Sequence, residues 1–246
     1  SQAYRLPIHR QWYKATAGHN AILVDGKSQE PAAGRLLAFA ATDTHAAAVA
    51  ACDEAYEGVR HVRALCLGPA YALVVDRLDA EKPRAYTWTY HNRGASVQCA
   101  AAAEPAGTAV PSEGAPPWWP YLKHVRAGMA DEAVRAAFVG KDVTTHLVCD
   151  AAEGTDVLAA DGPFTSVDDR VPLVMLTRRD KGARFACVLE PLRAGREPAM
   201  TSVSVRPDGD DLRVTVRRAG GDDVLHIAAD GNLRWTAGGK VVLESE

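Results

Sequence analysis

Histidine and acidic side chains gather in the first part of the chain, and these residue types can do acid–base chemistry or bind metal. Five of the eight histidines precede residue 95: His9, His19, His45, His61 and His91. Imidazoles and carboxylates on separate strands and loops can converge on zinc, which accepts both. No pair lies at a short ligand spacing, so spacing alone leaves open a metal site or a set of surface or hydrogen-bonded core histidines.

The elements that must position these groups read mostly as strands. Short β-branched runs bounded by Gly, Pro or Asp recur along the chain, for example at residues 21–26, 71–76 and 173–176. The last part alternates such runs with turn sequences and predicts an antiparallel meander. Many short strands with regular turns are typical of a sandwich or barrel.

Few segments favour helix. The Ala-rich run 44–52 has helical propensity but strand-like neighbours, so helix and strand both stay open there. Residues 131–138 predict one or two helical turns. Residues 100–120 are rich in Ala, Gly and Pro, and we interpret them as a long loop between two halves of a sandwich.

Three blocks of the N-terminal region resemble one known family. They are HRQWY at 9–13, AGHNAILVDGKSQ at 17–29, and AYEGV at 55–59 with the segment from Arg63 to Asp76. Together they resemble the C-terminal β-domain of the heparinase II/III family of polysaccharide lyases, which includes oligo-alginate lyases. The resemblance covers residues 4–95 well and the rest loosely. YTWTYH at 86–91 and LTRR at 176–179 also fit.

The resemblance implies a fold and an activity. It implies an all-β chain, a large antiparallel β-sandwich of two packed sheets with few short helices, forming one domain over residues 1–246. Such lyases cleave uronic-acid polysaccharides by β-elimination in a cleft between the sandwich and an N-terminal helical toroid. This chain has too few helical segments for a toroid and opens on Ser1, so we expect a C-terminal fragment or one piece of a split enzyme.

Two residues are predicted as catalytic. His9 lies in a loop segment preceded by a proline, where a side chain can reach a cleft. Tyr56 matches the tyrosine of the family's A-Y-x-G-V pattern. The alternatives are an exposed loop histidine and a packed aromatic residue whose hydroxyl is satisfied.

Four further residues are predicted to bind the acidic oligosaccharide. Trp12 and Tyr13 could form a sugar-stacking wall, Gln29 could contact hydroxyls, and the guanidinium of Arg63 suits a carboxylate. Core packing for Trp12, solvation for Gln29 and a structural salt bridge for Arg63 are the alternatives.

The resemblance also implies a structural zinc. His19 carries the histidine of the family's H-N pair and is the first predicted ligand, followed by Asp43 and His61, with His45 and His91 as competitors. Elimination needs no hydrolytic nucleophile, so the metal would brace the β-domain. Alternatively, His19 and Asn20 hold the loop by hydrogen bonds.

Composition narrows the function classes. The chain has 246 residues, a formal net charge of -3 and 47% hydrophobic residues, which is typical of a globular protein. Mild acidity argues against phosphate-backbone binding, and no run reaches the roughly 20 apolar residues of a membrane helix. Cys66, Cys149 and Cys187 lie in apolar runs and are predicted to be buried and free.

Two other functions stay open. The chain could be a carbohydrate-binding or domain-packing sandwich without chemistry of its own, or a plain zinc-stabilised β-module. Motifs of other enzyme classes are missing: the sequence has no G-x-S-x-G elbow, no P-loop and no G-x-G-x-x-G fingerprint.

Overall fold

The fold was analysed in a computed structural model that describes residues 3–105 and 114–245. Its largest sheet is built around a run of antiparallel neighbours. In order they are β2 (Arg35–Ala41), β3 (Ala46–Cys52), β4 (Val59–Leu67), β5 (Ala72–His91), β12 (Arg170–Arg193), β10 (Val143–Cys149), β9 (Val134–Val139) and β6 (Ser96–Cys99). Four more strands attach to it: β1 (Ile22–Val24), β11 (Thr155–Pro163), β8 (Lys123–Ala130) and β7 (Glu104–Pro105).

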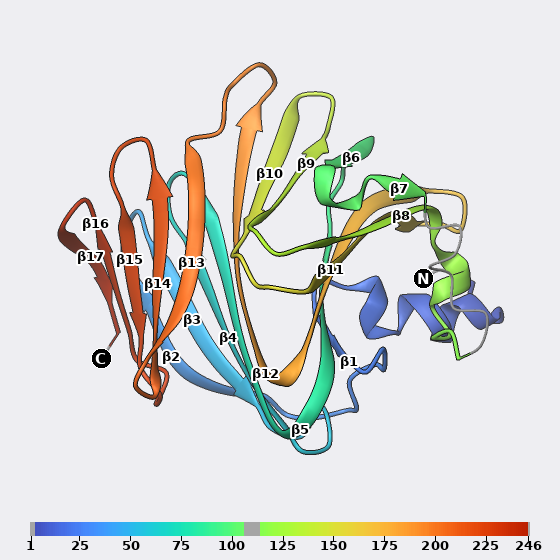
Figure 1. The fold of residues 1–246 in the computed structure, drawn as a ribbon, viewed down its shortest axis with the longest axis horizontal. Helices are drawn as coiled ribbons and strands as arrows, with labels where there is room; N and C mark the ends of the chain where they lie inside the picture. The colour runs from blue at the N-terminus through green and yellow to red at the C-terminus, as the bar shows by residue number, and fades with distance from the viewer. Residues whose placement is uncertain (1–2, 106–113, 246) are drawn as a thin grey trace.

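Two long strands fold this sheet back on itself. The first half of β5 pairs with the second half of β12, and the second half of β5 pairs with the first half of β12. The register shifts between Asp180 and Gly182, where the two strands bend together (Figure 1). A Cβ at Gly182 would lie 3.0 Å from the carbonyl oxygen of Leu78, so only glycine fits easily at the bend.

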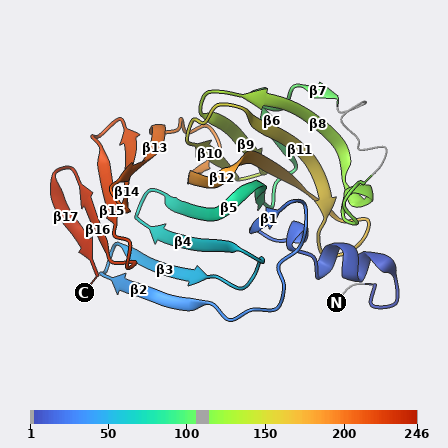
Figure 2. The ribbon, with the colours of Figure 1, turned by 60° about the horizontal axis from the view of Figure 1, so that its bottom comes forward.

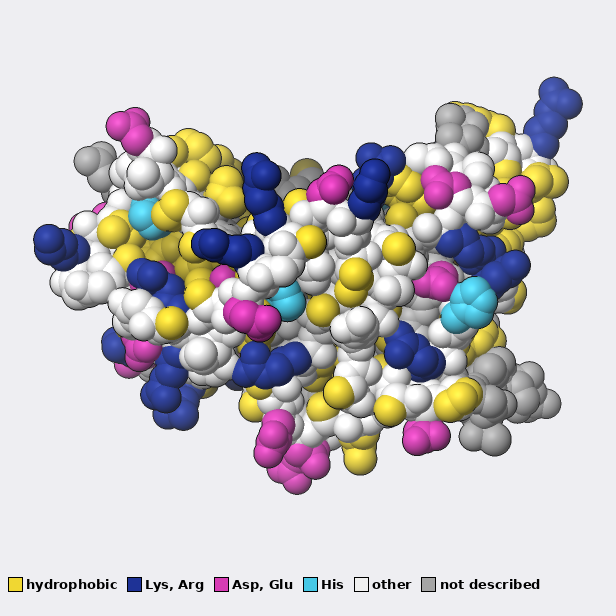
Figure 3. Space-filling model, turned by 90° about the horizontal axis from the view of Figure 1, so that it is seen from above, with side chains coloured by type: hydrophobic (Ala, Val, Ile, Leu, Met, Phe, Trp, Pro, Cys, Tyr) yellow, Lys and Arg dark blue, Asp and Glu magenta, His cyan; other side chains and the backbone are white. Residues whose placement is uncertain are grey.

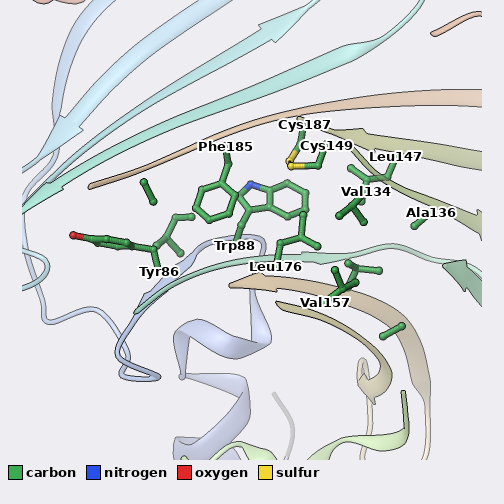
Figure 4. Packing of buried hydrophobic residues seen from close by; sticks show 14 of the residues in the cluster. Tyr86, Trp88, Val134, Ala136, Leu147, Cys149, Val157, Leu176, Phe185 and Cys187 are labelled. Atoms are coloured by element: carbon green, nitrogen blue, oxygen red, sulfur yellow. The ribbon is translucent and has the colours of Figure 1, made fainter. Parts of the chain in front are cut away.

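The bend divides the sheet into two layers. We call β2–β3–β4, the first half of β5, the second half of β12, β10, β9 and β6 the middle layer. The outer layer is β1, the other halves of β5 and β12, β11, β8 and β7 (Figure 2). Large buried side chains fill the space between them, including Trp88 and Leu176 from the outer layer and Phe185 and Leu147 from the middle layer (Figure 4).

A separate sheet covers the opposite face of the middle layer. It is the C-terminal sheet, a meander of β13 (Met200–Asp208), β14 (Asp211–Arg218), β15 (Asp223–Ile227), β16 (Leu233–Ala237) and β17 (Lys240–Glu244). Trp235 and Val214 of this sheet pack with Leu73 and Val75 of β5. Two sheets were predicted, but the fold of the larger one into two layers was not.

Short helical turns lie on the outer layer. They are η1 (His9–Tyr13), a π-helical turn, and the 3₁₀ turns η2 (Thr16–Gly18), η3 (Ala100–Ala102) and η4 (Trp119–Tyr121). Trp12 of η1 inserts against Leu173 and Ala160, and its Nε1 donates to the carbonyl of Pro163 over 2.8 Å. The N-terminal segment is thereby fixed to the outer layer.

The all-β prediction is confirmed, with local corrections. The run 44–52 contains strand β3, because β2 and β4 supply hydrogen-bond partners on both of its sides and override alanine's helical propensity. The helix predicted over 131–138 is wrong, because that segment enters β9 between β10 and β6. The predicted loop 100–120 contains η3, β7 and the start of η4, and its residues 106–113 lie outside the described part.

The three cysteine side chains predicted to be buried lie in the hydrophobic interior. Cys66, Cys149 and Cys187 are buried free thiols, as predicted. Within the described residues, no helix is long and apolar enough to cross a bilayer. On the face shown in Figure 3, acidic and basic side chains are interspersed instead of forming one basic band.

Candidate functional site

His19 is an exposed imidazole with a fixed orientation. Its Nδ1 lies 2.9 Å from the carbonyl oxygen of Ala15, and a carbonyl can only accept, so Nδ1 carries the proton. In the neutral ring Nε2 is then the basic nitrogen. Such a nitrogen can remove a proton, or return one after it has been protonated.

A second histidine is oriented by Asn20. The side-chain oxygen of Asn20 accepts from the backbone N–H of His91 over 2.7 Å and from its Nδ1 over 3.2 Å, while Nδ2 of Asn20 donates to the carbonyl of His91. Burial, together with the nearby charge of His19, lowers the pKa of His91 to about 4. His91 is therefore neutral at pH 7, and its buried Nε2 has no partner among the described residues.

A buried ion cluster in the middle layer supports the loop that carries His19 and Asn20. Asp76 is fully buried and accepts from Nε and Nη2 of Arg63 over 2.7 and 3.0 Å, and from Nε2 of His61 over 2.6 Å. Nη1 of Arg63 donates to the backbone carbonyl of Asn20 over 2.9 Å. Burial opposes ionisation, but Arg63 and His61 outweigh it and hold the pKa of Asp76 below its ordinary value.

In this cluster, the side chains of Arg63 and His61 make contacts inside the protein that favour structural roles. All three guanidinium nitrogens of Arg63 donate to groups inside the protein. A structural salt bridge therefore fits Arg63 better than binding of a substrate carboxylate does. Nε2 of His61 is occupied by Asp76, so only Nδ1 is left for a metal.

The two predicted catalytic residues are buried. His9 is 9% exposed, stacks on Tyr4 with ring centroids 4.3 Å apart, and its Nδ1 has no partner among the described residues. Tyr56 is 6% exposed and its hydroxyl donates to the carbonyl of Ile22 over 2.6 Å. Burial raises the pKa of Tyr56. This geometry matches the alternative of a packed tyrosine, and the catalytic roles stay predictions.

The predicted sugar contacts separate in space. Trp12 is 1% exposed and belongs to the core, whereas Tyr13 is half-buried. Gln29 is exposed and lines a groove of about 620 Å³, which we call the Gln29 groove, together with Arg10, Gln11, Lys27 and Trp118. Ala15, whose carbonyl accepts from His19, belongs to the same lining, whereas His19 itself is not one of the lining residues.

The predicted zinc ligands do not assemble. Among residues 3–105 and 114–245, no three His, Cys, Asp or Glu side chains are grouped as a metal site. Asp43 is exposed in the turn between β2 and β3, and its neighbour His45 packs on Trp235 of the C-terminal sheet. His19, Asp43 and His61 therefore do not fit a shared zinc, and no chemistry below uses one.

Sequence reasoning missed the role of Asp76. Asp76 ends both an apolar run and a block that resembles the family, and an acidic residue at an inward position of a strand signals a buried, paired carboxylate. The alternation Val59, His61, Arg63 along β4 points three side chains to one face, and this signal could have located the partners.

Comparison with known proteins identifies the family. The family described as "Heparinase II/III-like, C-terminal" matches residues 1–162. The chain belongs to this family. No curated protein sequence matches the chain.

Solved structures extend the likeness of this heparinase II/III-like domain over most of its length. A heparan sulfate lyase from Pedobacter heparinus aligns with a TM-score of 0.65 and 13% identity, over 93% of this chain and 33% of that one. A structure named heparinase III aligns with a TM-score of 0.63 and 15% identity, over 91% of this chain and 31% of that one. The chain thus shares their fold and spans about a third of their length.

Proposed function

We propose that this chain is the C-terminal β-sandwich part of a polysaccharide lyase that cleaves uronic-acid-containing glycans by β-elimination. The proposal includes an N-terminal helical toroid as the second wall of the cleft. Family membership supports the class of activity. The observation that carries the residue assignment is the exposed imidazole of His19, which is oriented by its hydrogen bond to Ala15 in the lining of the Gln29 groove.

β-Elimination at a uronate makes three chemical demands. The carboxylate must be neutralised, so that the proton on C5 becomes acidic; a base must take that proton; and an acid must protonate the leaving O4. His19 suits the second or third task, because its Nδ1 is held by Ala15 and its other nitrogen is free to exchange a proton. In the groove, Arg10 and Lys27 can pair with a carboxylate; the lining also holds the acidic Glu30 and Asp25, and Asp25 is paired with Arg84.

The test is an activity assay of the full-length protein. It follows the ultraviolet absorbance of unsaturated uronate products. Alginate, heparan sulfate and hyaluronan are the substrates. We expect His19→Gln to lower kcat/KM by about 100-fold or more, the usual scale for losing an acid–base group. His226→Gln, a partly exposed histidine of the C-terminal sheet, is the matched control and should retain activity.

A second candidate function is a carbohydrate-binding module without chemistry of its own. The burial of His9 and Tyr56, the two predicted catalytic side chains, favours it. Tyr56→Phe removes only the hydroxyl group that donates to the carbonyl of Ile22. If Tyr56 is a packed tyrosine, the variant should lose about 1–2 kcal/mol of stability and retain kcat. No product from any acidic glycan, or full activity in His19→Gln, would favour this module over the lyase.

A further inference from the structure

A second groove lies on the face of the outer layer that points away from the middle layer. It holds about 570 Å³, within the 300–1,000 Å³ common for small-molecule sites. We call it the Trp119 groove, and its lining includes Trp119, Thr87, Thr177, Asp156, Arg179 and Glu104. It is distinct from the Gln29 groove, with which it shares only Trp118.

Three polar side chains form a ladder across neighbouring strands in this groove. Thr87 of β5 is directly opposite Thr177 of β12, and Thr177 is directly opposite Asp156 of β11. Their neighbours Trp88, Leu176 and Val157 belong to the core between the layers, so by alternation the ladder faces outward. The two threonine hydroxyls are 2.8 Å apart.

An apolar row borders the polar ladder. Met175 and Leu158 are directly opposite each other and both line the groove. Each lies two residues along its strand from the polar pair Thr177 and Asp156, on the same face of the sheet. Ala127 of β8 continues this row opposite Leu158. Met175 is 3% exposed, so Leu158 and Ala127 supply most of the open apolar strip beside the row of hydrogen-bonding groups. This division matches the two kinds of surface of a sugar ring.

Trp119 supplies an aromatic wall. The other four tryptophans, Trp12, Trp88, Trp118 and Trp235, are at most 6% exposed, whereas Trp119 is half-buried. Nε1 of Trp118 donates to the carbonyl of Gly26 over 3.0 Å, which holds the tryptophan pair in place. A flat, partly exposed indole in a groove that also has polar side chains is suited to stack on an amphipathic ring.

The charges in the groove favour an uncharged ligand. Glu104 and Asp156 are acidic, and Arg179 is the one basic residue of the lining; Arg179 is paired with Asp156. With two carboxylates and one guanidinium, the groove disfavours a negatively charged ligand. Carboxylates readily accept hydrogen bonds from the hydroxyl groups of an uncharged one.

We propose that the Trp119 groove binds a neutral pyranose unit, with Trp119 against the ring and the ladder Thr87–Thr177–Asp156 hydrogen-bonded to its hydroxyls. This binding requires no lyase activity, and it adds a second sugar subsite beside the Gln29 groove.

The test is titration of the protein with neutral trisaccharides, namely maltotriose, cellotriose and triacetylchitotriose, with trigalacturonate as the acidic comparison. Intrinsic fluorescence reports on Trp119, and calorimetry gives Kd. At least one neutral trisaccharide should bind saturably, and Trp119→Phe should remove the fluorescence change. Asp156→Asn and Thr177→Val should each weaken binding about tenfold, the scale of one lost hydrogen bond.

Matched variants keep the result interpretable. Arg217→Gln removes an exposed arginine that is paired with Asp222 on the C-terminal sheet, and it should leave Kd unchanged. Thr177→Ser retains the hydroxyl and should restore binding, which separates hydrogen bonding from misfolding. Binding of trigalacturonate alone, binding of no neutral trisaccharide, or equal Kd in Asp156→Asn and Arg217→Gln would each overturn the proposal. Loss of lyase activity in His19→Gln bears on the proposed function and not on this groove.

Discussion

His19 and His91 show how backbone contacts decide what an imidazole can do. Each has Nδ1 committed to an oxygen, of Ala15 or of Asn20, so that Nε2 is the basic nitrogen of both neutral rings. They differ in burial: the side chain of His19 is exposed, whereas Nε2 of His91 is enclosed. In the proposed lyase, exposure therefore favours His19 for proton exchange and His91 for a supporting role.

Burial of His91 predicts a pH dependence of stability. Its pKa falls from 6.5 to about 4 on folding, so the unfolded chain binds more protons between these values. The free energy of unfolding should then decrease as pH falls from about 6.5 to about 4. Denaturant titrations of the wild type and of His91→Gln measure this slope.

The His91→Gln variant should lose part of the pH dependence in that window. His124→Gln is the surface control, since the His124 side chain is 79% exposed. A slope in His91→Gln as steep as in the wild type would show that His91 does not titrate as its burial implies.

At the scale of elements, η1 depends on one close approach to the outer layer. A Cβ at Gly162 would lie 2.4 Å from Cζ2 of Trp12 and 2.9 Å from Cδ2 of Leu173. The absence of a side chain at Gly162 is thus what lets Trp12 enter the layer and fix the segment that leads to His19.

Gly162→Ala should displace Trp12 and loosen η1. We expect a loss of about 1–3 kcal/mol, the usual cost of overpacking a core, with greater quenching of tryptophan fluorescence by acrylamide. Gly34→Ala is the control, because its added Cβ would lie 3.6 Å from the nearest atom and meet no clash. Equal melting temperatures for the two variants would contradict this account of Trp12.

The sequence predicts local elements better than it predicts their partners. The alternation in β14, Leu212–Val214–Val216, is buried on one side as expected, because a half-buried strand imposes that period. The strand alternation marks His61 and Arg63 as sharing one face, but their pairing with Asp76 depends on the register between β4 and β5, which the sequence does not report. His9 and Tyr56 matched family patterns, but a pattern does not report that a side chain is enclosed.

At the scale of the whole molecule, the C-terminal sheet is a cover for the middle layer. Residues Val49, Leu73, Val75 and Val188 are at most 2% exposed beneath it. Burying a side chain of this size is worth roughly 1.5–3 kcal/mol. The family match ends at residue 162, yet the sheet that begins at Met200 completes this core.

Ending the chain after Gly195 should therefore expose a continuous apolar surface. We expect aggregation or strong binding of a hydrophobic dye, measured by soluble yield and dye fluorescence. Trp235→Phe keeps the sheet with a smaller aromatic and serves as the control. A soluble, monomeric truncation with the melting temperature of the whole chain would show that the C-terminal sheet is dispensable.

The shared strands β5 and β12 also have a consequence for folding kinetics. Their pairing joins segments that are far apart in sequence, such as Leu73 with Val188, and the same pair carries both the middle and the outer layer. Neither layer can form in full until this long loop has closed, so the chain should fold slowly and with high cooperativity. Amide hydrogens at the bend and in both layers should then exchange through one common opening event.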